Sequence, residues 1–217
     1  MKYELDNFII ESDIELDYLS DIANYVSENE NKILDFFELD KLPNKVKILI
    51  LSYDSFKDFI ISKYGEILDY YSGDSDSKTN TIRVLNIEDQ IKYTIHKNAN
   101  LDAIKSEVLH EIVHQCHNIF HKDYKQINWF SEGLATNLAN QEYTIADLND
   151  CDFDRLKNDF RHYKGNYKYA YTIVNYILNN YSKDEIIKLY SDPDYLREKS
   201  NSIFEEAKNN IYFGIIK

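Results

Sequence analysis

The stretch HEIVHQCHNIFH, residues 110–121, carries histidines at successive offsets of four, three and four residues. At about 100° per residue, His110, His114, His117 and His121 fall on one narrow stripe of an α-helix. The apolar side chains of this region lie on a different arc of the same helix: Leu109, Ile112, Val113, Cys116, Ile119 and Phe120. The pattern therefore predicts an amphipathic helix with a histidine front and an apolar back.

Spacing along the helix separates these histidines into two pairs. A rise of about 1.5 Å per residue puts His110 and His114 about 6 Å apart along the axis, so their imidazoles can converge on one ion. His117 lies about 10.5 Å from His110 along the axis, too far for shared ligation on an unbroken helix. We therefore predict metal ligation by His110 and His114. A surface role is expected for His117 and His121, with hydrogen bonding within or beside a cleft as the alternative.

Glu111 follows the first ligand and projects to the side of His114, where it can take a proton from water. The string H-E-x-x-H joins two neutral imidazoles that hold zinc to a carboxylate that serves as base, as zinc proteases require. An ordinary amphipathic helix with solvated histidines also fits this one motif.

A third ligand is expected from WFSEGLATNLANQ, residues 129–141. Catalytic zinc bound by two histidines usually takes one more protein ligand and keeps a position open for water. Glu132 is the candidate, because the segment 118–128 before it can end the first helix and turn the chain back. The small side chains of Ala135, Thr136 and Ala139 beside it then let the second helix cross the first closely. The alternative is a solvated carboxylate in the first turn of a helix, favoured by the helix dipole.

Taken together, HEIVH and WFSEGLA resemble the paired motifs of the gluzincins. These zinc metallopeptidases include thermolysin and the aminopeptidase N type, and the resemblance is strongest to small bacterial peptidase MA-like domains. It covers roughly residues 81–181. It implies a zincin-like fold and one zinc ion held by His110, His114 and Glu132, with Glu111 as general base.

Further roles follow from the resemblance alone. An edge strand, either Ile91–Lys97 or Thr81–Asn86, would line the cleft and pair with an extended substrate. The stretch YKYAYTIVNYI, residues 167–177, resembles the helix whose first tyrosine points at the substrate carbonyl. Tyr167 is thus the expected oxyanion donor, with Tyr171 as the fallback and His162 as a distant third.

The chain departs from the family at two places. The G-x-M-E-N stretch with which the aminopeptidase N type holds the substrate amine has no match, so exopeptidase specificity is not expected. Thr136 stands where thermolysin-like enzymes have an aspartate, although it is still expected to touch a metal ligand. The sequence predicts a zinc metallopeptidase acting on peptides or proteins. The alternative is a catalytically inactive zinc-binding module that recognises a protein or peptide partner.

Composition limits the partners. The 217 residues carry a formal net charge of -13, which repels phosphate backbones and anionic lipid surfaces, so neither nucleic acid nor membrane is expected. Residues 1–18 lack the apolar run of a signal peptide, and a cytoplasmic location is expected. Cys116 and Cys151 are too few for a disulfide framework and are predicted to be reduced thiols.

The predicted fold class is α+β, in a single zincin-like metallopeptidase domain over residues 1–217. The expected parts are N-terminal helices (1–42), a β-region (43–98), catalytic helices (99–141) and a helical C-terminal part (142–217). Expected local features are capping boxes at Ser12/Glu15 and Ser182/Glu185, two helices before residue 42, a strand at 45–52, a helix closed by Gly65, and strands at 81–86 and 91–97. The stretch SGDSDSKTN, residues 72–80, is expected to be an exposed, mobile loop.

Overall fold

The computed structural model describes residues 1–120, 127–141 and 143–211. The chain forms two compact units, Met1–Cys116 and His117–Lys217. The boundary falls inside one helix, α4 (Leu101–Phe120), so the expectation of a single zincin-like domain stays a prediction. Within the described residues, none of the helices is both long enough and apolar enough to cross a bilayer.

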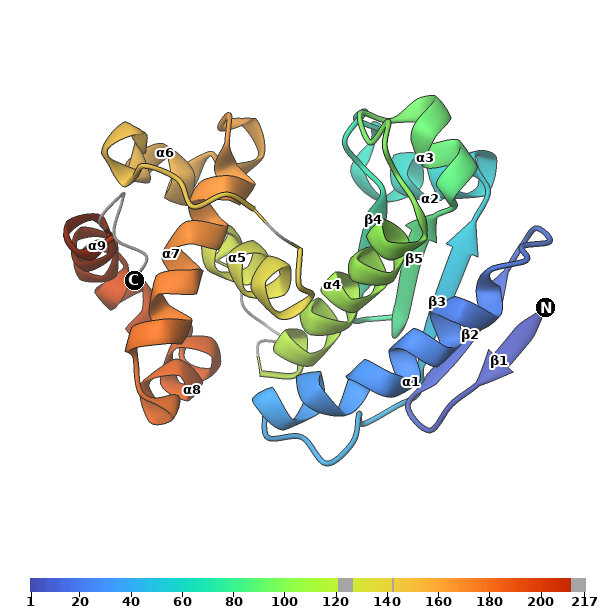
Figure 1. Ribbon diagram of the computed structural model, residues 1–217, viewed down its shortest axis with the longest axis horizontal. Coiled ribbons are helices and arrows are strands. Elements are labelled where there is room, and N and C mark those ends of the chain that lie inside the picture. The colour runs from blue at the N-terminus through green and yellow to red at the C-terminus, as the bar shows by residue number, and fades with distance from the viewer. Residues whose placement is uncertain (121–126, 142, 212–217) are drawn as a thin grey trace. The chain divides into compact units, whose positions relative to one another are not determined.

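A five-stranded mixed sheet organises the first unit (Figure 1). Its strands are β1 (Lys2–Glu4), β2 (Phe8–Ser12), β3 (Val46–Leu51), β4 (Gly73–Asp76) and β5 (Thr81–Leu85), in the spatial order β1-β2-β3-β5-β4. The three central strands run parallel, and both edge strands are antiparallel to their neighbours. The strand predicted at 45–52 is thus confirmed as β3, and the one at 81–86 as β5.

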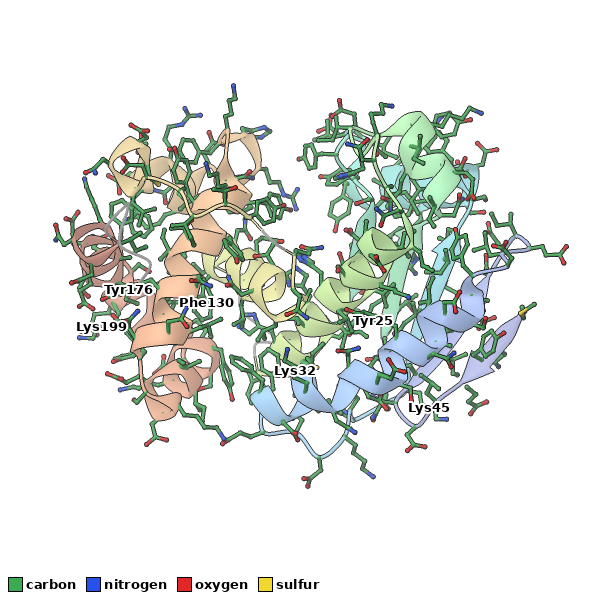
Figure 2. All side chains as sticks on the ribbon, viewed as in Figure 1. Tyr25, Lys32, Lys45, Phe130, Tyr176 and Lys199 are labelled. Carbon is green, nitrogen blue, oxygen red and sulfur yellow. The ribbon has the colours of Figure 1, made fainter. Side chains whose placement is uncertain are left out.

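Helices cover both faces of this sheet (Figure 1): α1 (Leu19–Phe36) and α4 lie on one, and α2 (Tyr53–Tyr64) on the other. Successive side chains along each strand point to opposite faces of the sheet, so both faces carry apolar side chains. Ile48, Ile50, Ile82 and Val84 are fully buried on the α1 and α4 side, while Leu51 and Leu85 pack with Phe56 and Ile60 of α2. On α1, Tyr25, labelled in Figure 2, lies under Lys105 of α4, with Nζ 5.5 Å from the ring centre.

The N-terminal segment differs from the prediction of two helices. Residues 2–12 form β1 and β2, and Ser12 ends β2 instead of starting a capping box. The helix that follows is a single one, because the buried stripe of α1 continues through Glu30: Leu19, Ile22, Ala23, Val26, Glu30, Ile33 and Leu34. A charged residue at this inward position interrupts the apolar pattern in the sequence but not the helix. The alternation of buried Phe8 and Ile10 in β2 is the strand signal that was missed.

Two further predictions are wrong. Residues 91–97 were expected to form a strand, but α3 (Ile87–Tyr93) covers the first half of this range. The helix is capped by Asn86, whose side chain accepts a hydrogen bond from the Asp89 backbone N–H. The alternating Ile91, Tyr93 and Ile95 point outward and are 39–57% exposed. The loop predicted at 72–80 contains the edge strand β4.

The second unit is helical in its described part. Its α-helices are α5 (Asn128–Leu138), α6 (Phe153–Asn158), α7 (Asn166–Asn180), α8 (Lys183–Ser191) and α9 (Pro193–Asn210), with short 3-10 turns η1 (Leu148–Asp150) and η2 (Phe160–His162). The capping box predicted at Ser182 and Glu185 is present at the start of α8. Phe153 stacks on Phe204 at 4.3 Å between ring centres, which joins α6 to α9. A sheet in the N-terminal half and helices in the C-terminal half confirm the α+β class.

Candidate metal centre

The histidine-bearing helix α4 is held at its start and along its length. Asn100 caps it, since its Oδ1 accepts a hydrogen bond from the Ala103 backbone N–H at 3.0 Å. Of the predicted apolar back, Leu109, Ile112, Val113 and Cys116 are at most 1% exposed, whereas Ile119 and Phe120 at the end of the helix are half-buried. The polar front is also shielded from water, because His110 and Glu111 are each 6% exposed and His114 is 8% exposed.

His110 and His114 face one another across one turn of α4. Their Nε2 atoms are 3.1 Å apart and their ring centres 4.7 Å apart. Tetrahedral zinc with Zn–N bonds of about 2.0–2.1 Å separates two nitrogen ligands by about 3.3 Å. The pair is therefore spaced almost as a shared zinc ion requires.

Glu132 completes a possible ligand set. One potential ligand atom from each of His110, His114 and Glu132 lies within 4.8 Å of the other two. Two imidazoles and a carboxylate are the donors that zinc accepts in hydrolytic sites, and three of them leave one position open. The described residues thus contain a group that could hold a metal ion, made of the three ligands predicted from the sequence.

Glu111 lies against the edge strand β4. A Cβ built on Gly73 would come within 2.7 Å of Glu111 Oε1 and 2.5 Å of Glu107 Oε1, so both carboxylates occupy the space that a side chain at position 73 would need. Glu107 is one turn before Glu111 on the same ridge of α4.

This ridge of α4 is tied to β4 on both sides of Gly73. The Ser72 hydroxyl donates to Glu107 Oε1 at 3.0 Å, and Gln115 Nε2 donates to Ser75 Oγ at 2.8 Å. His96 Nε2 lies 3.5 Å from Ser72 Oγ and 3.2 Å from the Tyr70 carbonyl, so the bend after α3 also contacts this strand end.

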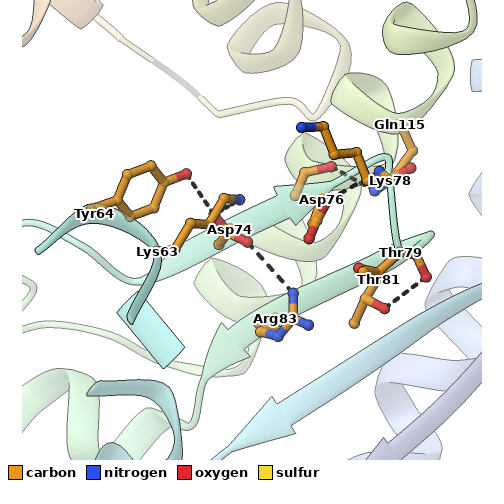
Figure 3. A network of polar contacts seen from close by, with 10 residues as sticks. Lys63, Tyr64, Asp74, Asp76, Lys78, Thr79, Thr81, Arg83 and Gln115 are labelled. Atoms are coloured by element: carbon orange, nitrogen blue, oxygen red, sulfur yellow. Dashed lines mark hydrogen bonds and ion pairs between the residues drawn. The ribbon is translucent and has the colours of Figure 1, made fainter. Parts of the chain in front are cut away.

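The opposite face of β4 is held by ionic contacts, which Figure 3 shows around Asp74. Lys63 Nζ and the Tyr64 hydroxyl, both from α2, reach Asp74 Oδ1 at 2.7 and 2.8 Å, and Arg83 of β5 reaches Oδ2 at 3.6 Å. The Asp74 side chain is only 2% exposed. Burial lowers the pKa of Arg83, whose guanidinium carbon lies 3.6 Å from the centre of the Phe59 ring. The edge strand is thereby fixed from both faces.

Within the second unit, α5 packs closely on α7. A Cβ on Gly133 would lie 2.5 Å from the Ala170 carbonyl oxygen, so the glycine next to Glu132 permits the approach of the two helices. Asn137 Nδ2 donates to the Tyr171 carbonyl at 3.1 Å and adds a polar link. Phe130, labelled in Figure 2, is 1% exposed and anchors the start of α5.

Thr136 was expected to touch a metal ligand. Its hydroxyl donates to the backbone carbonyl of Glu132 at 2.8 Å and lies 3.0 Å from that of Gly133. The contact with Glu132 is present, but the hydroxyl bonds the main chain and not the carboxylate.

The candidate oxyanion donors lie on or just before α7. Tyr167 is half-buried in its first turn, with its ring 5.4 Å from that of Phe160. Tyr171, one turn later, is also half-buried and has its ring 5.7 Å from that of Tyr143. His162 is exposed in η2. The predicted roles of these three residues stay predictions.

His117 corrects the sequence interpretation. It was expected at the surface, yet it is 3% exposed, with Nδ1 3.4 Å from Ser131 Oγ and its ring 6.0 Å from that of Phe130. The aromatic and hydroxyl side chains at the start of α5 cover this part of the histidine stripe. His121 lies outside the described residues.

Both cysteines are free, as predicted. Cys116 is fully buried on the apolar back of α4, and burial raises the pKa of its thiol to about 12. Burial likewise raises the pKa of the half-buried Cys151 to about 11. Neither thiol is therefore activated as a nucleophile near neutral pH.

Comparison with known proteins adds no assignment: no protein-family model matches the chain, and no curated protein matches its sequence. The centre's own side chains define what it can do. Three donors suited to a divalent ion and an adjoining carboxylate form a set that can bind a metal and move a proton beside it.

Proposed function

We propose that this protein is a zinc-dependent metallopeptidase that hydrolyses peptide bonds with Glu111 as general base. The observation that carries the proposal is the convergence of His110, His114 and Glu132, with Glu111 beside them in the same buried turn of α4. The resemblance of HEIVH and WFSEGLA to the gluzincin motifs supports the same chemistry.

In this proposal, a zinc ion would be held by the side chains of His110, His114 and Glu132. Zinc in such a set supplies a Lewis acid that polarises a carbonyl and makes water nucleophilic near neutral pH. Glu111 takes the proton of the attacking water and passes it to the leaving amine nitrogen. The hydroxyl of Tyr167 donates to the carbonyl oxygen as negative charge develops there, with Tyr171 as the alternative donor.

The edge strand β4 supplies a binding surface for an extended substrate. The Leu85 backbone N–H donates to the Ser72 carbonyl, and in an antiparallel pair the next residue directs its N–H and C=O away from the partner strand. Gly73 and Ser75 therefore turn their backbone groups to the open edge, where a peptide can add as a further strand. In this role β4 replaces both strands expected from the sequence.

The proposed substrate is a peptide or protein, since an extended backbone pairs with a sheet edge and the charge of -13 opposes nucleic acid. The two free cysteines fit a reducing compartment, so we propose a cytoplasmic location.

The test is hydrolysis of a peptide library by the zinc-loaded protein and by Glu111→Gln. The wild type should cleave, and Glu111→Gln should bind one zinc ion per chain yet lose nearly all activity, because the amide cannot accept the proton. Glu88→Gln, an exposed position on α3, is the matched control and should keep full activity. Undiminished cleavage by Glu111→Gln would refute the general base.

An inactive zinc-binding module is the second candidate, based on the absent G-x-M-E-N stretch. It predicts one zinc ion per chain with no cleavage at any peptide length.

A further inference from the structure

We propose that Gly73 is a positioning residue for Glu111, and that its lack of a side chain sets where the general base stands. The inference rests on the proposed function, since it assigns a partner to the base of that reaction. A Cβ at this position would lie 2.7 Å from Glu111 Oε1, against about 3.4 Å for ordinary van der Waals contact. The carboxylate would have to retreat by about 0.7 Å.

The strand itself has little freedom to retreat. Hydrogen bonds from Ser72 to Glu107 and from Gln115 to Ser75 tie β4 to α4 on either side of Gly73. On the other face, Asp74 is held by Lys63 and Tyr64 (Figure 3). Pairing with β5 fixes the register of Gly73 opposite Val84.

The two atoms that a new methyl group would meet are the ends of flexible side chains. The strain therefore goes into moving the two carboxylates and not into unfolding, although a shift of Glu107 Oε1 also strains its hydrogen bond with Ser72. A displacement of the base of under 1 Å is enough to lower the rate, since misplacement by about 1 Å can reduce catalysis about 100-fold. Gly73 thus acts on the reaction through Glu111 without touching the substrate's reacting atoms.

The experiment compares Gly73→Ala with the wild type in zinc content, in kcat and KM, and in crystal structures of the zinc-loaded proteins. Gly73→Ala should bind one zinc ion, keep KM within about threefold, lose about 100-fold in kcat, and show the Glu111 carboxylate shifted by about 0.7 Å or more. Gly65→Ala is the control for a glycine substitution in the same unit: no atom lies within 4 Å of its Cβ, so kcat should stay unchanged even though φ +85° strains the backbone.

Glu111→Asp provides a rescue test, because the shorter side chain withdraws from position 73. If the two residues are coupled, the double variant should lose less kcat than the two single losses multiplied together, by a factor of at least about five. The inference would be overturned if the losses in kcat of the two single variants simply multiplied in the double variant. It would also be overturned if Gly73→Ala kept the wild-type kcat, or if its crystal structure showed the Glu111 carboxylate in the wild-type position. If zinc-loaded wild type cleaves no peptide, the proposed function fails, and the position of Glu111 in the two crystal structures still decides the role of Gly73.

Discussion

The Nε2 atoms of His110 and His114 lie 3.1 Å apart, close to the separation that two nitrogen ligands have on one zinc ion. Replacing His114 by Ala should therefore weaken zinc binding by at least about 100-fold, because changes in residues that merely orient ligands already cost about 10–100-fold. Competition with a chromophoric chelator measures the affinity. His162→Ala, at an exposed position, should bind zinc as the wild type does, and equal affinities in all three proteins would remove His114 from the centre.

Asp74 is a buried anion between two cations, and its removal should destabilise the first unit. Asp74→Ala leaves Lys63 and Arg83, whose side chains are 27% and 13% exposed, without their carboxylate, and breaking such a buried set costs about 3 kcal/mol. Urea unfolding followed by circular dichroism measures this loss. Lys45→Ala removes the exposed Lys45–Glu4 pair and should change stability by less than about 1 kcal/mol. A similar effect from both variants would contradict the structural role given to Asp74.

Gly133 should respond to substitution quite differently from Gly73. A methyl group on Gly133 meets the backbone oxygen of Ala170 at 2.5 Å and Val174 Cγ2 at 2.6 Å, so α5 and α7 must separate. Gly133→Ala should lower the free energy of unfolding by about 1–3 kcal/mol, as overpacking does. Because Glu132 is the adjoining residue, zinc affinity should fall as well. Gly73→Ala should change stability by less than about 1 kcal/mol, and the reverse order of the two losses would contradict this packing.

The thiol groups give a pH-dependent prediction. The pKa values of Cys116 and Cys151, about 12 and about 11, exceed the ordinary value of 9.0 because burial disfavours the thiolate. Native protein at pH 8 should react with iodoacetamide far more slowly than unfolded protein, with Cys151 ahead of Cys116. Mass spectrometry of timed samples distinguishes the two sites.

The same shifts fix the sign of a stability change. An unfolded thiol loses its proton from about pH 9, while the folded thiol keeps it to higher pH. The free energy of unfolding is therefore unaffected below pH 9 and falls as pH rises toward 12.

The iodoacetamide experiment also has a contradicting outcome. Rapid labelling of Cys116 in the native protein would show that α4 opens in solution.

The sequence predicted those features of the chain that depend on a single local pattern. Four-residue spacing predicted that His110 and His114 face one another on α4, and the run at 45–52 predicted β3, because each pattern lies within a few residues. Glu132 was proposed from the second motif, and the small residues beside it were expected to let its helix cross the histidine helix. The contact that the structure resolves at Gly133 is with Ala170 of α7.

The features that the sequence did not reveal depend on contacts distant in the chain. The strand β4 is polar on both faces, since Ser75 meets Gln115 and Asp74 meets Lys63, and a strand without an apolar face resembles a loop. The alternation of small Gly73 and Ser75 with acidic Asp74 and Asp76 was the only signal. His117 appeared to be solvent-facing because the side chains that bury it come from α5.

Anomalous diffraction at the zinc edge, from crystals of the zinc-loaded protein, locates the metal ion and its ligands directly. We expect one zinc ion bound by nitrogens of His110 and His114 and by a carboxylate oxygen of Glu132, each at about 2.0–2.2 Å. Zinc bound elsewhere, or Glu132 more than about 4 Å from an ion on the two histidines, would contradict it.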